Sequence, residues 1–186
     1  QHRRKREGGG SIIELSADYF FLRGSKFLLI CEQFSRMIGC VYMDPSTDVV
    51  RASVKKWLLE MGRLGNEGIL NVFTDDEVAV GAVFFHLGVG KDVKVSKAPP
   101  QSQAMNGLAE RSVRAIKESF LCVSEELRQK GLEICESGKS VAVALEYVCF
   151  MMNMHASVHG SSKTPQEFLS SKKMSAPTTS AFGAVV

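Results

Sequence analysis

The chain has 186 residues, of which 45% are hydrophobic and 23% charged, and its formal net charge at pH 7 is +3. That length fills one globular domain and is short for two. The small excess of basic residues, 23 against 20 acidic ones, neither requires nor excludes a nucleic-acid partner. The five cysteines form no C-x-x-C pair, which argues against a zinc module or a disulfide framework and favours an intracellular protein.

The two ends differ in composition from the middle of the chain. Residues 1–10, QHRRKREGGG, are basic and end in glycine, so we expect a flexible basic lead-in; a nuclear signal or a nucleic-acid arm has the same composition. Residues 175–186 are small and polar, as in a tail or the start of a linker. The domain itself should span residues 11–174. We expect no membrane span, because no apolar run approaches the roughly 20 residues that one needs.

The first part of the domain is predicted to be a three-stranded antiparallel meander. Residues 11–22, 26–34 and 36–43 are apolar, rich in aromatic side chains and separated by short turns. Residues 44–65 then place apolar side chains at helical spacing, with Asp44 as a cap and Pro45 at the first helical position. The sequence therefore predicts three strands followed by an amphipathic helix.

The second part of the domain alternates strand and helix. Residues 68–74 form a short apolar strand, residues 75–88 a short helix and residues 92–97 another strand, and two long helices follow, the first beginning after Asn106-Gly107. A helix between two strands implies a parallel crossover. The order predicts an α/β fold with a five-stranded mixed sheet, three antiparallel strands and then two parallel crossovers, flanked by helices.

Three acidic residues should meet at one end of this sheet. Asp18 lies in the first strand, Asp75 follows the fourth, and Glu110 lies near the start of the helix after the fifth. If the first and fourth strands are neighbours, the three carboxylates converge where α/β folds place ligand sites.

Each of these acids also has a purely structural interpretation. The segment from Thr74 to Glu77 matches a capping box, S/T-x-x-E, at a helix start. Asp18 lies among apolar residues, where a carboxylate is costly unless it is paired, bound to a cation or turned towards water. Glu110 near a helix N-terminus is favoured by the helix dipole whether or not it takes part in chemistry.

The helix that contains Glu110 carries basic residues beside its apolar stripe. Glu110, Arg114 and Lys117 lie at positions i, i+4 and i+7. One interpretation is a solvated helix face with an ordinary ion pair between Glu110 and Arg114. The other is that Glu110 binds a metal ion and that Arg114 and Lys117 beside it bind phosphate groups of DNA. The preceding loop adds polar side chains that offer hydrogen bonds to nucleic acid, namely Gln101, Ser102, Gln103 and Asn106.

The ordered set of Asp18, Asp75 and, 35 positions later, Glu110 resembles the catalytic core of retroviral and retrotransposon integrases, which belong to the ribonuclease H-like superfamily. The resemblance covers most of the chain. The segments that carry it are SADYFF, KFLLICEQFSRMIGCVYM, NVFTDD, PPQSQAMNGLAERSVRAIKES and ALEYVCFMMNMHASVHGSSKTPQEFL.

The resemblance implies a metal-dependent polynucleotidyl transferase that processes the 3′ ends of element DNA and joins them to target DNA. Asp18 and Asp75 would share two Mg²⁺ or Mn²⁺ ions and Glu110 would complete the shell of the second, since hard oxygen ligands suit these ions. Such an ion pair, about 4 Å apart, can activate a water or a DNA 3′-hydroxyl and stabilise the leaving oxygen. Arg111, beside Glu110 in this motif, would join Arg114 and Lys117 on the DNA.

The resemblance also implies partners and a location. They are double-stranded DNA, a second copy of the chain in a homodimer or higher multimer, and the nucleus when the protein acts on host DNA. The family's zinc-binding amino-terminal module and carboxy-terminal DNA-binding domain have no counterpart in this sequence. We therefore expect a core excised from a longer polyprotein, with no zinc site in this fragment.

Several positions depart from the family pattern. Asp76 and Glu77 follow Asp75 where the family has Asn-Gly, and Val80 replaces an aromatic residue. The second strand has Glu32-Gln33 where an aspartate with a polar or basic neighbour is usual. Two alternatives to an active integrase core follow. One is a catalytically decayed module that keeps the fold to bind DNA or protein. The other is a ribonuclease H-like nuclease, whose fourth carboxylate would have to come from the TDDE segment.

Overall fold

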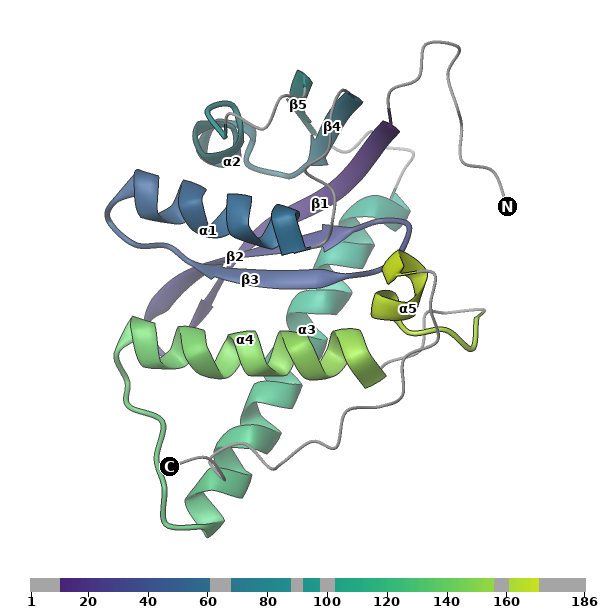
Figure 1. Ribbon diagram of the computed structural model, residues 1–186. Coiled ribbons are helices and arrows are strands. Elements are labelled where there is room, and N and C mark those ends of the chain that lie inside the picture. The colour runs from purple at the N-terminus through teal and green to yellow at the C-terminus, as the bar shows by residue number, and fades with distance from the viewer. Residues whose placement is uncertain (1–10, 61–67, 88–91, 98–102, 156–160, 171–186) are drawn as a thin grey trace.

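A five-stranded mixed sheet in the order β3-β2-β1-β4-β5 lies at the centre of the structure, a computed structural model (Figure 1). The structure describes residues 11–60, 68–87, 92–97, 103–155 and 161–170. The expected boundaries of the domain, at the basic lead-in and the tail, lie outside these residues. The predicted order of strands and helices along the chain and the five-stranded mixed sheet are confirmed.

The first three strands form the predicted antiparallel meander. They are β1 (Ser11–Leu22), β2 (Ser25–Glu32) and β3 (Ile38–Tyr42). The turn between β1 and β2 is Arg23-Gly24, and both residues have positive φ, 46° and 74°. Such two-residue turns match the right-handed twist of the strands they join, which explains the tight hairpin.

Two parallel strands extend the sheet on the other side of β1. They are β4 (Gly68–Phe73), which pairs with β1, and β5 (Asp92–Ser96), which pairs with β4. The connection between β4 and β5 includes helix α2 (Glu77–Phe84). The central place of β1, antiparallel to one neighbour and parallel to the other, makes the first and fourth strands neighbours, as the site prediction required.

Helices cover both faces of the sheet with separate apolar cores. On one face pack α1 (Thr47–Glu60) and α2, with the short helix α5 (Pro165–Ser170) contributing Leu169. On the other face pack α3 (Gln103–Gln129) and α4 (Gly138–His155). None of the described helices combines the length and the apolar character that a membrane span requires.

Two helix starts differ from the prediction. Helix α1 begins at Thr47, and Asp44 and Pro45 precede it; the Asp44 carboxylate accepts the Ser46 N–H at 2.9 Å, while the Ser46 carbonyl accepts the Val50 N–H. Asp44 therefore stabilises the turn before the helix instead of capping it. Helix α3 begins at Gln103, so Asn106 and Gly107 lie inside it.

The short helix α5 was not predicted as an element of its own, although its start is well marked. The Thr164 N–H donates to the Glu167 carboxylate at 2.9 Å, and the Glu167 N–H donates to the Thr164 hydroxyl at 3.3 Å. This reciprocal pair is a capping box. The TPQE segment is thus explained by the start of α5.

Candidate active site

The parallel pairing of β1 and β4 brings Asp18 and Asp75 to the same edge of the sheet. Ser16 pairs with Phe73, the last residue of β4, and the two aspartates each lie two positions further along their chains. Asp18 is half-buried within β1, and Asp75 is exposed just beyond β4. The register of one strand pair therefore places both acids at the carboxyl end of β4.

Glu110 reaches the same region from α3. Along β1 Asp18 shares a face with Phe20, because alternate side chains of a strand point the same way. Phe20 belongs to the core that α3 covers with Ile116 and Phe120. Glu110 is exposed and lies about two turns inside the helix, so the predicted benefit from the N-terminal helix dipole does not apply to it.

The electrostatics of Asp18 show that the three acids are neighbours. Burial raises the pKa of Asp18 above its ordinary value of 3.8, a hydrogen bond with the Tyr19 backbone lowers it, and the negative charges of Asp75 and Glu110 raise it further. A carboxylate responds in this way to like charges nearby. The structure thus brings together the three residues that the sequence singled out.

The three carboxylates do not enclose an ion as they stand. Within the described part of the chain, no three His, Cys, Asp or Glu side chains are grouped closely enough to hold one. Three carboxylates fit the hard oxygen ligands that Mg²⁺ and Mn²⁺ prefer. Their mutual repulsion, seen in the raised pKa of Asp18, favours a spread arrangement until a cation compensates the charge.

The acids after Asp75 form a helix start that differs from the predicted capping box. The N-cap of α2 is Asp76, whose carboxylate accepts the Ala79 N–H at 3.1 Å. Thr74 lies two residues earlier, is buried, and its hydroxyl accepts the Asp76 N–H at 3.2 Å. Because the helix begins at Glu77, the cap is the residue just before it, and the Glu77 side chain itself is not among those described.

The charge of Asp76 acts on the opposite face of β1 from Asp18. Burial raises the pKa of Tyr19 to about 12, and the negative charge of Asp76 contributes to the rise. Tyr19 packs against the core under α1 and α2, and the Lys26 ammonium lies 3.9 Å from the centre of its ring. Asp76 is therefore poorly placed to be a fourth carboxylate beside Asp18.

The basic side chains predicted to contact DNA lie along α3. Arg111 and Arg114 are exposed, and Lys117 is half-buried with its ammonium 5.7 Å from the centre of the Phe20 ring. Between Glu110 and Arg114, both described, no ion pair forms. Gln103 and Asn106 belong to the first turn of α3 instead of a loop, and their side chains are not described; Gln101 and Ser102 lie outside the described residues.

Two buried polar side chains outside the predicted site hold the ends of β2 and β3 in place. Glu32, at the end of β2, accepts hydrogen bonds from the Ser35 N–H and hydroxyl, so this departure from the family pattern stabilises the turn into β3. Asn153 of α4 accepts the Ile38 N–H at 2.9 Å and donates to the Ile38 carbonyl at 2.8 Å. In the sequence, Asn153 is an amide within the apolar stretch VCFMMNM, residues 148–154, of this helix.

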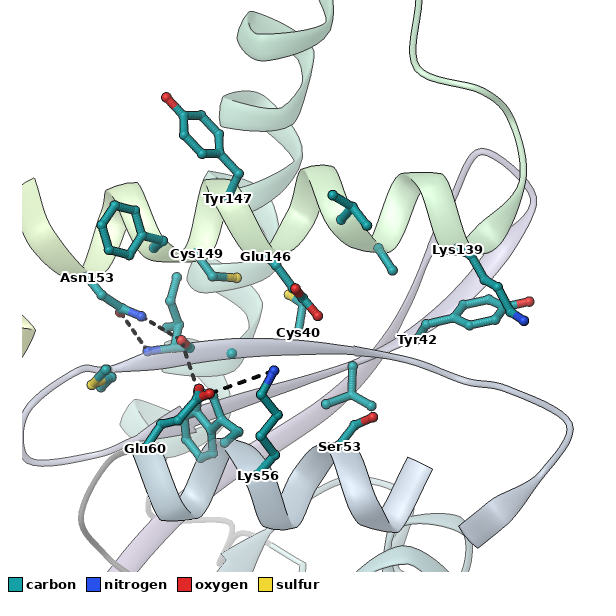
Figure 2. Close-up of a pocket in the computed structure, with 18 of the residues that line it drawn as sticks. Cys40, Tyr42, Ser53, Lys56, Glu60, Lys139, Glu146, Tyr147, Cys149 and Asn153 are labelled. Carbon is teal, nitrogen blue, oxygen red and sulfur yellow. Dashed lines mark hydrogen bonds and ion pairs between the residues drawn. The ribbon is translucent and has the colours of Figure 1, made fainter. Parts of the chain in front are cut away.

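A groove lies between α1 and α4, over the free edge of β3 (Figure 2). Its volume is about 1030 Å³. Exposed apolar side chains lie on both walls, Val49 on α1 and Val143 and Phe150 on α4. Charges of both signs also line it: Lys56 and Glu60 on α1 form an ion pair of 3.8 Å, and Lys139 and Glu146 lie on α4.

Comparisons with known proteins match this chain only at the level of structure. No protein-family model and no curated protein matches it. The catalytic core domain of BIV integrase is similar with a TM-score of 0.54 and 16% identity, over 85% of this chain and 93% of that one. The HTLV-2 integrase catalytic core domain in complex with magnesium, in a trimeric form, is similar with a TM-score of 0.58 and 14% identity, over 85% of this chain and 95% of that one.

A third similar structure comes from the simian T-cell lymphotropic virus intasome in complex with a PP2A regulatory subunit. The TM-score is 0.59 with 15% identity, and the match covers 96% of this chain and 63% of that one. All three identities are low, so the agreement concerns the backbone arrangement. The chain has the ribonuclease H-like fold of a retroviral integrase catalytic core domain.

Proposed function

We propose that this chain is a metal-dependent DNA polynucleotidyl transferase of the integrase type, which processes element DNA ends and joins them to target DNA. One observation carries the proposal. In an integrase-core fold, strand pairing and helix packing bring Asp75 and Glu110 near enough to Asp18 for their charges to raise its pKa. Three mutually repelling carboxylates at a sheet edge destabilise the folded protein unless a bound cation compensates their charge.

The three acids would have different roles in metal binding. Asp18 and Asp75 would hold the shared ligand positions, fixed by β1 and by the end of β4, and Glu110 would complete the set from α3. Two Mg²⁺ or Mn²⁺ ions, when bound, would supply activation of the attacking hydroxyl and stabilisation of the leaving oxygen. No protein nucleophile is then needed.

Double-stranded DNA is the proposed substrate, and the nucleus the proposed place of action. Arg111 and Arg114 are exposed on the helix that carries Glu110, and Lys117 follows one turn later. Cations at this spacing suit successive phosphates, so binding should weaken as salt rises. The polar residues from Gln101 to Asn106 would add hydrogen bonds.

A second copy of the chain is the proposed occupant of the α1–α4 groove. Exposed apolar residues lie on both of its walls, and each wall carries a lysine and a glutamate, so two copies facing each other can pair opposite charges. Two of the similar structures are described as a trimeric form and as an intasome. A homodimer or higher multimer is the assembly that we propose for this chain.

A catalytically decayed module that binds DNA or protein through the same fold is the second candidate. It is favoured by the absence, among the described residues, of three acidic side chains grouped to hold an ion. The two candidates differ in one measurable property, which is whether the acids bind a divalent ion.

The test is calorimetric titration with Mn²⁺ of the unmodified chain, Asp75→Asn and the control Asp92→Asn. Asp92 is also an exposed acid, but it begins β5 and pairs with Ile69, at the far end of β4 from the site. We expect micromolar to millimolar binding by the unmodified chain and the control, weakened at least about tenfold in Asp75→Asn. If all three proteins bind Mn²⁺ equally, or if none binds it, the metal-dependent transferase is ruled out and the decayed module is supported.

A further inference from the structure

The hydrogen bonds around Asp75 fix the backbone on both sides of it. Before it, the buried Thr74 donates its N–H to the Ser96 carbonyl of β5 at 3.1 Å. After it, the Asp76 N–H donates to the Thr74 hydroxyl, so the two neighbours of Asp75 are bonded to each other. The chain therefore leaves β4 through a tight, bonded turn with Asp75 at its tip.

Asp76 connects this turn to α2. Its carboxylate accepts the Ala79 N–H at 3.1 Å, and its carbonyl accepts the Val80 N–H at 3.1 Å. The first bond satisfies a backbone donor that a helix start otherwise leaves free. The position of Asp75 thus depends on a helix that is anchored by the next residue.

The extra negative charge at Asp76 has its own compensation. It lies at the N-terminus of α2, where the helix dipole favours an acid. Its charge acts on Tyr19, which lies on the face of β1 that turns away from Asp18 and has the Lys26 ammonium over its ring. The Asp76 carboxylate is therefore stabilised by the start of α2, outside the cluster of Asp18, Asp75 and Glu110.

We propose that Asp76 is a positioning residue, which holds Asp75 in the site by capping α2 and is not itself a metal ligand. The inference rests on the proposed function and explains why an aspartate stands where the family pattern has asparagine. Both side chains present an oxygen that can cap a helix, so the substitution keeps the cap and adds a charge directed elsewhere.

The test compares Asp76→Asn and Asp76→Ser, which keep a capping oxygen and lose the charge, with Asp76→Ala, which loses both. Mn²⁺ affinity is measured by calorimetry. We expect the Asn and Ser variants to stay within about threefold of the unmodified chain and the Ala variant to weaken by about tenfold. The control is Asp48→Ala, which removes an exposed acid from the first turn of α1 and should leave affinity unchanged.

Amide hydrogen exchange and the NMR signal of the Asp75 amide give a second readout that needs no metal. Protection of the Ala79 amide should be kept in Asp76→Asn and Asp76→Ser and lost in Asp76→Ala. The Asp75 signal, after correction for the ordinary effect of a changed sequence neighbour, should stay in place in the first two variants and move in the third. Circular dichroism shows whether each variant is folded. Equal loss of Mn²⁺ binding in the Asn and Ala variants would make Asp76 a ligand and overturn the proposal. An Asp75 signal unaffected in Asp76→Ala would overturn it too, whereas absence of Mn²⁺ binding by the unmodified chain would overturn only the proposed function.

Discussion

At the scale of single residues, Asp18 has an energetic cost in the candidate site. It is half-buried in a strand whose neighbours are apolar, and two further acids act on it. Both burial and like charges disfavour its ionised form. The protein therefore keeps a carboxylate where folding alone would select a neutral side chain, which is typical of a site that serves a ligand.

The pH dependence of stability tests this cost. The pKa of Asp18 is raised above 3.8, so between the unfolded and the folded pKa the folded state binds more protons than the unfolded state. The free energy of unfolding should then fall as the pH rises through that interval. We expect Asp18→Asn to be more stable than the unmodified chain at neutral pH and to lack this fall.

Urea denaturation across the acid range measures the effect, in metal-free buffer. Asp92→Asn, at an exposed position on β5, is the control and should keep the profile of the unmodified chain. A loss of stability in Asp18→Asn at neutral pH would mean that the ionised carboxylate is favourably paired in the folded state, contrary to the electrostatics of the site.

At the scale of elements, the free edge of β3 is held by side chains instead of a further strand. Figure 2 shows Asn153 reaching from α4 to the β3 backbone. Its amide exchanges two hydrogen bonds with Ile38, and the Trp57 ring N–H of α1 donates to the same carbonyl at 3.3 Å. Both helices that flank the groove are thus bonded to the strand beneath it.

Replacing Asn153 by alanine should lower the free energy of unfolding by about 1–3 kcal/mol, because it leaves a buried backbone N–H without its partner. Thermal or urea denaturation measures the change. Glu146→Ala, at an exposed position of the same helix, should change stability by less than about 0.5 kcal/mol. A loss in Asn153→Ala no larger than in Glu146→Ala would show that the bonds to Ile38 add nothing.

The sequence predicted the elements better than their ends. Alternation and helical spacing report which side chains are buried, and they placed all five strands and the buried stripe through Ile116 and Phe120. The ends depend on individual hydrogen bonds. Asp44 was predicted to cap α1, but its carboxylate accepts a hydrogen bond from Ser46 before the helix. Thr74 was predicted to cap α2, but Asp76 is the capping residue and Thr74 accepts the Asp76 N–H. Periodicity carries no information about which of several nearby polar side chains makes such a bond.

At the scale of the whole molecule, the site and the groove lie in different parts of the fold. The acids are at β1, β4 and α3, whereas the groove is bounded by α1, α4 and the β3 edge. The meeting of the acids was predictable because it follows from the pairing of β1 with β4 and from the place of Glu110 in the helix after β5. The groove was not, because it arises from the packing of two helices distant in sequence and from surface residues that no local pattern distinguishes.

Val143→Glu and Phe150→Glu test the groove as an interface between copies. We expect the unmodified chain to sediment as a dimer, and each variant to sediment as a monomer with an unchanged circular dichroism spectrum, since a charge would face the apolar wall of the other copy. Leu121→Glu, an exposed apolar position on α3, is the control. A dimer that persists in both groove variants would place the interface elsewhere.

The central position of β1 also affects how the protein is made. The first three strands are adjacent in the chain and can pair as soon as they leave the ribosome. The other edge of β1 stays open until β4 has been synthesised, because Ser11 of β1 pairs with Gly68 of β4. Contacts so distant in sequence form slowly, and an open apolar strand edge invites pairing with other chains in the meantime. The three acids are therefore brought together only once the start of α3 has been synthesised, so a chain that ends before it has all five strands but lacks Glu110.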